Sequence, residues 1–535
     1  MKRCIALLSL LTLTAPVPAL TIRVGADPGC DTSSLAVALT RAKANPGADT
    51  IHIARNQVYA NQELFVDSDV TLRGGYTSCD APAPDGRTEL AGSGSWAVVT
   101  AWTDTPDGIV VRLEGLDIRN GGAGGDIGDF GGVSVGGRTR VAIADARIHD
   151  NVAIVGGGVS VNGTNAIVDV EHTVEIDNNR ASLGGGFGVA GGTLRLRPYA
   201  VVIRDNRAAD GGGVYVDAGL VGVGSDPDIA RPVDGLLVRN NTASNRGGGI
   251  HVRGTFGKLL AESTVIRDNT AGIEGGGAYG SDGGYIQFTR YSMGPQRPCS
   301  AEQECLRLSG NTAPRGGGIA LAAGATGALF HSMIRDNLAD DGPAISVRGQ
   351  NSELRLLGSI VARNRCVGAN TMCAPIRTTA GKLRFTYTTI ADNTAGASIP
   401  SPIFADGSSG DSITQYAFYS TLISGHTQLY AQNGAATTHT GDCLIMSAGQ
   451  IWSGLSRSDI APIEFVDAPR GNYRLRPGNS AIDYCTSGLA PTDDPDIDGT
   501  VRGIESPGNA NDFGTFDVGA YEYERLFAGG FEGLR

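Results

Sequence analysis

One repeated phrase constrains the fold of this chain more than any other feature. Each copy contains an aliphatic residue, charged or amide residues, an asparagine, small residues, glycines and then alternating apolar residues, as in IRDNRAADGGGVYV at 203–216. The asparagine marks the register of the copies: Asn120, Asn151, Asn179, Asn206, Asn241, Asn269, Asn311, Asn337, Asn364 and Asn393. Successive asparagines are 26 to 31 residues apart, except for two stretched intervals of 35 and 42 residues. A period of this length indicates a solenoid in which each copy stacks on the next.

The pattern within each copy indicates strands rather than helices. Apolar residues alternate with period two after the glycines, as in Val214/Val216 and Ile345/Val347, which is strand spacing. Helical repeats would show a period of 3.6 and far fewer glycines than the 79 of this chain. Glycine and asparagine also tolerate the positive φ angles of tight turns. We therefore predict an all-β parallel β-helix, with three short strands and three turns in each coil of about 27 residues.

The stacking predicts where the polar residues of the repeat point. The asparagines would lie one above another and hydrogen-bond amide to amide along the solenoid axis. The aliphatic residue before them would point inward and the charged residues outward. The pairs Arg204/Asp205, Arg267/Asp268 and Arg335/Asp336 would then form a stripe of mixed sign, which avoids a column of like charges. This interpretation makes these aspartates structural.

The repeat also resembles a known pattern. Triple-glycine phrases paired with I-x-x-N-x-A over residues 118–405 resemble the repeats of polymorphic outer-membrane proteins and of pectate-lyase-like β-helix proteins. The resemblance implies a right-handed parallel β-helix. It implies little about activity, because this architecture includes lyases, hydrolases, adhesins and autotransporter passengers.

The N-terminal region predicts export followed by a capped solenoid. Lys2 and Arg3, the short apolar run 4–14 and the small residues at 17–19 are typical of a cleaved signal peptide, residues 1–19. An uncleaved N-terminal anchor is the alternative, and the later sequence contains no transmembrane span. Residues 20–117 would form an N-terminal cap and the first coils. The segment LAVALTRAKAN after Ser34 would be the capping helix.

The C-terminal region departs from the repeat. Residues 406–471 predict less regular coils, and residues 524–535 form a short tail. The sequences PGNSAID at 477–483 and DVGAYE at 517–522, with Asp498 and Arg502 between them, closely resemble the choice-of-anchor Q domain, which follows β-helices in bacterial surface proteins. We assign this domain to residues 472–523.

The cysteines predict disulfides. Cys4 would leave with the signal peptide, and the remaining eight fall in near pairs: Cys30/Cys79, Cys299/Cys305, Cys366/Cys373 and Cys443/Cys485. An even number of cysteines in an exported chain favours disulfide bonds. Proximity in the sequence suggests these pairings, although eight cysteines allow 105 different ones.

One acidic segment has the spacing of a calcium loop. The pattern D-x-D-x-D-G-x5-E places ligands at Asp494, Asp496, Asp498, Thr500 and Glu505. We predict a structural Ca²⁺ there. The alternative is an acidic turn in which Asp498 or Asp494 pairs with Arg502.

The stretched interval of 42 residues is the candidate for ligand binding. Tyr285, Phe288, Arg290 and Tyr291 predict an aromatic and cationic surface loop that binds sugar rings or a protein partner. The alternative is an insertion that packs against the rod.

The expected function follows from the net charge of the chain and from the catalytic motifs that its sequence lacks. The net charge of −12 gives no attraction for nucleic acid. The NTD, HG and RIK motifs of polygalacturonase-like hydrolases are absent from the sequence, and His149 and His251 are expected to be surface or packed residues of the repeat. We predict a monomeric protein, secreted or on the outer cell surface, that acts as an adhesin or a carbohydrate-binding or surface-binding scaffold. A polysaccharide lyase or glycoside hydrolase and a purely structural spacer are the alternatives.

Overall fold

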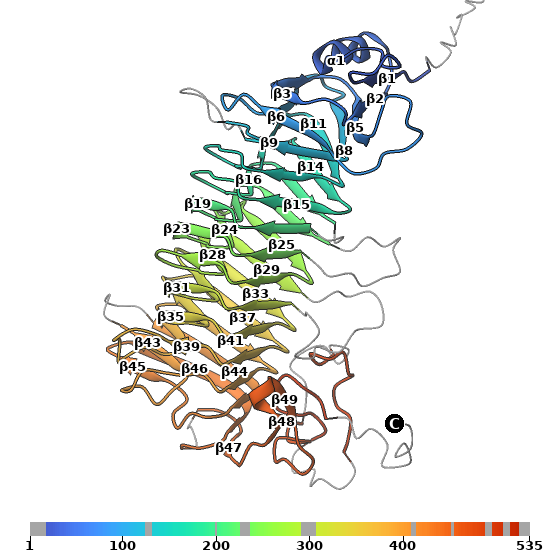
Figure 1. Cartoon of the computed structure of the whole chain (residues 1–535). Coiled ribbons are helices and arrows are strands. Elements are labelled where there is room, and N and C mark those ends of the chain that lie inside the picture. The colour runs from blue at the N-terminus through green and yellow to red at the C-terminus, as the bar shows by residue number, and fades with distance from the viewer. Residues whose placement is uncertain are drawn as a thin grey trace, which may run out of the picture.

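The computed structural model describes residues 18–122, 131–197, 201–224, 236–289, 306–407, 413–450, 454–486, 495–506 and 514–523. These residues form one long stack of short strands, with the N-terminal cap at one end and the C-terminal segment at the other (Figure 1). The strands fall into parallel sheets of 28, 13 and six strands and one antiparallel pair. We name the three parallel sheets the first sheet, the second sheet and the short sheet, respectively. The predicted all-β parallel β-helix is therefore confirmed.

Each coil adds strands to the same sheets as the coil before it. In the first sheet, the consecutive coils around the candidate site contribute β9 (Leu116–Arg119), β12 (Arg147–His149), β15 (Val174–Asp177), β18 (Val201–Arg204) and β22 (Leu237–Arg239). The second sheet contains β10 (Val133–Gly137), β13 (Val159–Asn162), β16 (Phe187–Ala190), β20 (Val214–Asp217), β24 (Ile250–Arg253) and β28 (Ala278–Ser281). The short sheet contains β19 (Arg207–Asp210), β23 (Thr242–Arg246), β27 (Thr270–Ala271), β31 (Thr312–Arg315), β35 (Leu338–Asp341) and β39 (Arg365–Cys366).

The pairing repeats residue by residue from coil to coil. Val214 lies beside Ile250 in the second sheet, and Ile203 lies beside Val238 in the first. Equivalent positions of neighbouring copies are therefore about 4.8 Å apart, which is the spacing of hydrogen-bonded strands. The interior is filled by the inward-facing aliphatic residues of every strand, with a few aromatic rings such as Phe385 stacked on Phe418, centroids 5.3 Å apart.

The predicted asparagine ladder is present. Asn179 Nδ2 donates to Asn206 Oδ1 at 3.0 Å and to the carbonyl of Ile148 at 2.9 Å. The same amide-to-amide bond links successive asparagines along the described coils: Asn151, Asn179, Asn206, Asn241, Asn269, Asn311, Asn337, Asn364 and Asn393. All are buried. The ladder fixes the corner that follows the first sheet in each of these coils.

Asn120 is not part of this ladder, and its predicted register was wrong by one residue. Its φ of 59° matches that of Asp150, 52°, which precedes the first ladder asparagine. Gly121 occupies the ladder position instead, and its backbone N–H donates to Asn151 Oδ1 at 2.8 Å. Asparagine is one of the few residues that adopt a left-handed backbone at low cost, so it fits either position.

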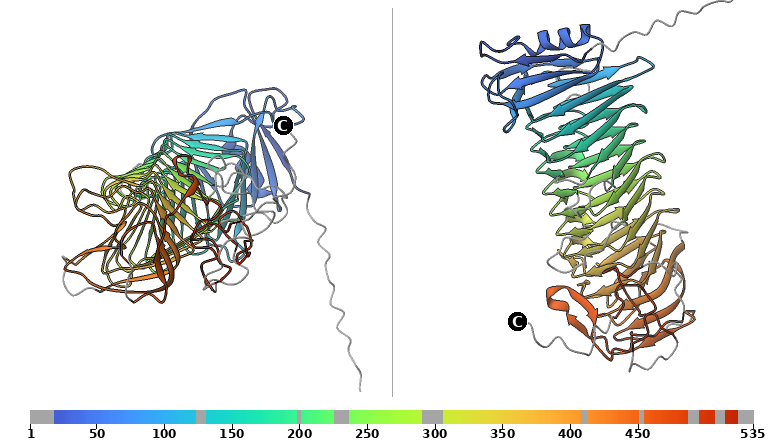
Figure 2. Two further views of the ribbon diagram at one scale, coloured as in Figure 1. Left: turned by 90° about the horizontal axis from the view of Figure 1, so that it is seen from below. Right: turned by 90° about the vertical axis from the view of Figure 1, so that its right-hand side faces the viewer.

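The ends of the stack are closed differently. At the N-terminus, α1 (Leu35–Ala44) buries Leu35, Ala38, Leu39 and Ala42 over the first coil, and Ser34 accepts a hydrogen bond from the backbone N–H of Val37. The predicted capping helix is therefore present. At the other end, the stack contains two longer strands, β44 (Ile413–Ile423) and β46 (Ala436–Met446). The chain then leaves the stack through β48 (Phe465–Asp467), the 3₁₀ turn η1 (Ala468–Arg470) and β49 (Asn472–Leu475). Figure 2 shows both ends.

The C-terminal segment folds back along the side of the rod. The backbone N–H of Ala520 donates to Thr389 Oγ1 at 2.9 Å, and the guanidinium of Arg502 lies 4.0 Å from the ring centroid of Tyr387. Met333, Ile360, Ala362 and Ala391 of the rod form one buried cluster with Tyr473, Ile497, Ala520 and Tyr521. The residues that resemble a choice-of-anchor Q domain therefore cover the outer surface of the last coils.

Candidate functional site

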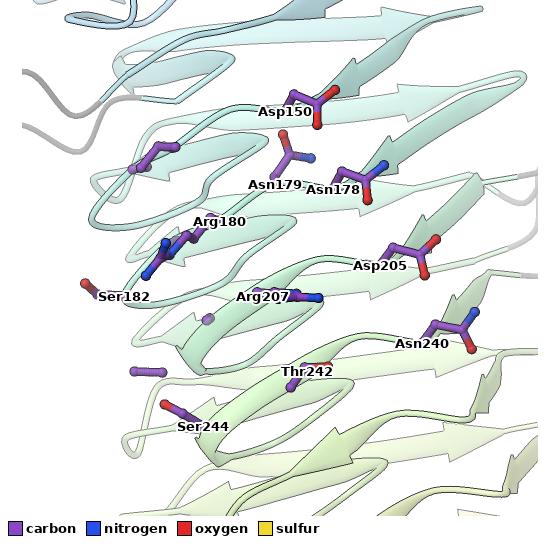
Figure 3. A pocket seen from close by; sticks show the side chains of 15 residues that line it. Asp150, Asn178, Asn179, Arg180, Ser182, Asp205, Arg207, Asn240, Thr242 and Ser244 are labelled. Atoms are coloured by element: carbon purple, nitrogen blue, oxygen red, sulfur yellow. The ribbon is translucent and has the colours of Figure 1, made fainter.

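A groove of about 1070 Å³ runs along the corner between the first sheet and the short sheet (Figure 3). It spans four coils. Its lining residues are Asp150, Val152, Ala153, Asn178, Asn179, Arg180, Ala181, Ser182, Asp205, Arg207, Ala208, Ala209, Asn240, Thr242 and Ser244. Each of these four coils therefore contributes residues at equivalent positions of the repeat.

The repeat places three rows of side chains in this groove. The residue before each ladder asparagine has a left-handed backbone and points outward, which makes a wall of Asp150, Asn178, Asp205 and Asn240. The residue after each ladder asparagine forms the floor, which is Val152, Arg180, Arg207 and Thr242. Ser182, Ala209 and Ser244 follow on the opposite side. The three rows are a consequence of period-two alternation on both sides of the buried asparagine.

The wall alternates carboxylates with amides. Asp150 and Asp205 belong to coils separated by the coil of Asn178, so their backbones are about 10 Å apart, twice the strand spacing. Interleaving the amides keeps like charges off adjacent strands, where they would be destabilising. The predicted stripe of mixed sign is present as well, because Asp205 pairs with Arg204 at 2.6 Å and Asp268 pairs with Arg267 at 3.0 Å.

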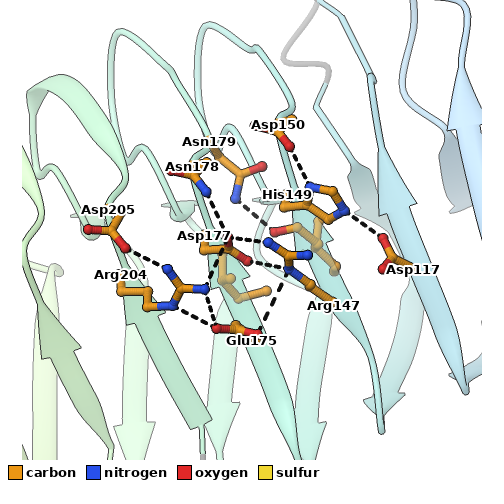
Figure 4. Close-up of polar contacts among 12 residues, drawn as sticks. Asp117, Arg147, His149, Asp150, Glu175, Asp177, Asn178, Asn179, Arg204 and Asp205 are labelled. Carbon is orange, nitrogen blue, oxygen red and sulfur yellow. Dashed lines mark hydrogen bonds and ion pairs between the residues drawn. The ribbon is translucent and has the colours of Figure 1, made fainter. Parts of the chain in front are cut away.

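A network of ion pairs supports the wall from the first sheet (Figure 4). Arg147 makes two hydrogen bonds with Asp177, of 2.9 and 2.8 Å, and Arg204 binds Glu175 at 2.6 Å. Burial raises the pKa of Asp177, but the hydrogen bonds and charge of Arg147 and the charge of Arg204 outweigh it, so the pKa lies below its ordinary value. The network holds the side chains beside the groove in fixed positions.

His149 belongs to the same network. Its Nε2 lies 2.6 Å from Asp117 Oδ1, and its Nδ1 lies 2.6 Å from Asp150 Oδ2. Burial lowers the pKa of His149, but the two carboxylates outweigh burial and raise it above the ordinary value. The imidazole ring therefore joins a wall carboxylate to the first sheet, and both ring nitrogens are occupied. A general base needs a free nitrogen, so this geometry is that of a support.

The floor contains two arginines without acidic partners. Arg180 and Arg207 lie on adjacent coils, joined by a parallel bridge, and both are exposed. Within the described residues, neither guanidinium is within ion-pair distance of a carboxylate, whereas Arg147 and Arg204 beside the groove each contact more than one. The floor is therefore a local positive patch on a chain whose net charge is −12.

The residues of the predicted calcium loop have other contacts in the structure. Asp494 lies outside the described residues. Asp496 is buried, and its carboxylate accepts hydrogen bonds from the backbone N–H groups of Asp498, Thr500 and Glu522 at 2.7 to 2.9 Å. Asp498 pairs with Arg474 at 2.8 Å rather than with Arg502, and Glu505 is exposed.

Calcium binding is therefore still a prediction. No group of three or more His, Cys, Asp or Glu residues in the described ranges is arranged to hold a metal ion. Titration calorimetry with Ca²⁺ would test the predicted site.

The predicted aromatic loop is only partly described. Arg290 and Tyr291 lie outside the described residues. Tyr285 and Phe288 belong to β29 (Tyr285–Thr289), a regular strand of the first sheet. Phe288 is fully buried in the core, and the half-buried Tyr285 donates to Gln287 Oε1 at 2.7 Å. Placing Phe288 in a ligand-binding surface was wrong, because strand alternation turns it inward.

The cysteine pairs have three different outcomes. Cys30–Cys79 and Cys366–Cys373 are disulfides, as predicted. Cys299 and Cys305 lie outside the described residues. Cys443 and Cys485 are buried free thiols that share a hydrogen bond, so the fold brings this pair together without joining it.

Comparison with known proteins adds no family assignment. No protein-family model matches the sequence, and no curated protein matches it significantly. The described part of the chain also contains no helix long and apolar enough to cross a membrane. The class that the structure defines is the parallel β-helix, with a polar groove along one corner.

Sequence reasoning missed this groove, although a signal for it was present. The position after each repeat asparagine is arginine in two consecutive copies, Arg180 and Arg207. A search for like charges at equivalent repeat positions would have selected both residues.

Proposed function

We propose that this chain is an exported β-helix protein that binds carbohydrate along the groove and acts as an adhesin or a surface-binding scaffold. The observation that carries the proposal is the groove itself, which repeats a polar wall position in each of four coils and a polar floor position in three of them. A linear sugar chain parallel to the rod axis would meet equivalent groups at each step. Amides, carboxylates, guanidiniums and hydroxyls can all hydrogen-bond to sugar hydroxyls.

Two sequence resemblances support the proposed export and cell-surface location of the protein. The signal-like residues 1–19 favour export, and the choice-of-anchor Q resemblance of residues 472–523 favours a place on a bacterial cell surface. Sequencing the N-terminus of the mature protein from its native host tests the first. Fractionation of the cell envelope tests the second.

Glycan arrays followed by calorimetry test the binding. Thr242→Trp fills the groove floor, whereas Thr394→Trp makes the same change in the same column outside the groove, beside Arg365. Both threonines are exposed strand or bridge residues, so neither change disturbs the core. We expect Thr242→Trp to abolish binding and Thr394→Trp to leave it unchanged. Equal affinity of both variants would exclude the groove as the binding site, and the absence of any glycan ligand would contradict carbohydrate binding altogether.

A polysaccharide lyase or hydrolase is the second candidate. Asp150 and Asp205 lie on one groove wall, and paired carboxylates are what a glycosidase requires. His149 and Arg204 already bind these two carboxylates, which favours binding over catalysis. An assay for new reducing or unsaturated ends decides between them. Product formation that Asp205→Asn abolishes would make this protein an enzyme.

A further inference from the structure

The two floor arginines lie directly beside one another in the stack. Arg180 and Arg207 occupy the same position of consecutive coils, about 4.8 Å apart along the axis. Like charges directly opposite on neighbouring strands destabilise a sheet. At several other places in the rod, one acid contacts two neighbouring arginines: Asp169 lies within 4 Å of both Arg140 and Arg195, and Glu353 contacts both Arg355 and Arg384.

The nearby acids do not neutralise the two arginines. Asp150 is bound to His149, and Asp205 is bound to Arg204. The amides of Asn178 and Asn240 fill the wall positions between and beside these acids. The groove thus keeps two adjacent positive charges on its floor, with exposed guanidiniums and no anion from the described chain in contact with them.

We propose that Arg180 and Arg207 bind successive acidic groups, carboxylate or sulfate, of a polysaccharide seated in the groove. This inference rests on the proposed function and names the class of its ligand. Guanidinium groups match the planar, bidentate geometry of carboxylates and bind sulfate oxygens in the same way. The overall negative charge repels polyanions at long range, so selectivity comes from contact with the floor.

The test uses the full chain and three sets of oligosaccharides of equal length: neutral, uronic-acid and sulfated. The double variant R180Q/R207Q keeps the side-chain length and removes both charges. The control is R365Q, because Arg365 has the same column position between Leu338 and Thr394 but lies outside the groove. Affinity is measured by calorimetry at low and high salt, and thermal unfolding is recorded for each variant.

We expect acidic oligosaccharides to bind more tightly than neutral ones, and more weakly as salt is raised. The double variant should lose about tenfold in affinity for them, which is the loss expected for two exposed ion pairs. R365Q should behave as the original chain. Affinity for neutral oligosaccharides should not change, and the unfolding temperature of the double variant should stay constant or rise, since it relieves a repulsion.

Three results would overturn the inference. Neutral chains that bind as tightly as acidic ones would refute it while leaving the groove a carbohydrate site. Loss of thermal stability in R180Q/R207Q would show that the arginines serve the fold. Failure of every sugar to bind would refute the proposed function as well.

Discussion

The asparagine ladder offers the sharpest test of the fold, through Asn206→Ala. The Asn206 side chain makes four hydrogen bonds: Nδ2 donates to the carbonyl of Ile176 at 2.9 Å and to Asn241 Oδ1 at 3.0 Å, and Oδ1 accepts from the N–H and the Nδ2 of Asn179 at 3.0 Å each. The substitution leaves the backbone N–H of Asn179 and the carbonyl of Ile176 without these partners in a buried corner.

The expected cost follows from those two groups. A buried polar group left unsatisfied costs about 1–3 kcal/mol, so two of them cost about 2–6 kcal/mol. Asn178→Gly is the matched control, because glycine adopts the left-handed backbone of Asn178, with a φ of 54°, without strain. Asn178 is the neighbouring exposed asparagine and its Nδ2 donates to Asp177 Oδ2, so the change should cost about 1 kcal/mol or less.

The assay is chemical denaturation followed by circular dichroism. The denaturant concentration at the midpoint of unfolding is compared between variants whose transitions have the same slope. Asn206→Asp is a second variant of nearly equal volume. It places a carboxylate oxygen where the Nδ2 donor faced two acceptors, so it should destabilise the chain at least as much as alanine does. If Asn206→Ala cost no more than Asn178→Gly, the ladder would not be the element that fixes the coil corner.

Three further predictions concern the C-terminal segment. Burial raises the pKa of Glu522 to about 7, so the folded segment keeps a proton that the unfolded chain releases. The folded segment should therefore be most stable below about pH 4.5 and lose stability as the pH rises through 7. In unfolding experiments, Glu522→Gln should flatten this dependence of stability on pH. Arg502→Met removes the hydrogen bonds to the buried carbonyls of Gly519 and Ala520 and should cost about 2–6 kcal/mol, with faster limited proteolysis of the segment. Arg470→Met at a largely exposed site should change neither the stability nor the proteolysis. Cys443 and Cys485 are buried thiols that the fold brings into hydrogen-bonding contact, so an oxidant that reaches them should join the pair as a disulfide. Mass spectrometry of unreduced peptides would show the disulfide, and detection of two free thiols after oxidation under unfolding conditions would contradict this.

Local pattern determined most of the fold. The period-two alternation, the recurrent asparagine and the glycine turns each act within one copy, so they predicted parallel strands, a buried amide ladder and outward arginines. Two of the cysteine pairs predicted from proximity in the sequence, Cys30/Cys79 and Cys366/Cys373, are disulfides. The single error of register, at Asn120, arose because asparagine suits both the left-handed turn and the ladder position beside it.

Only the tertiary structure decided the rest, because it depends on which copies become neighbours. Phe288 could be placed only once the register of β29 against its neighbours was known. The groove exists because equivalent positions of four coils align, which turns two isolated arginines into one positive floor. The C-terminal segment packs on coils more than 100 residues earlier in the chain, as the bond from Ala520 to Thr389 shows. Such contacts arise from stacking and docking across long separations, and a one-dimensional pattern carries no information about them.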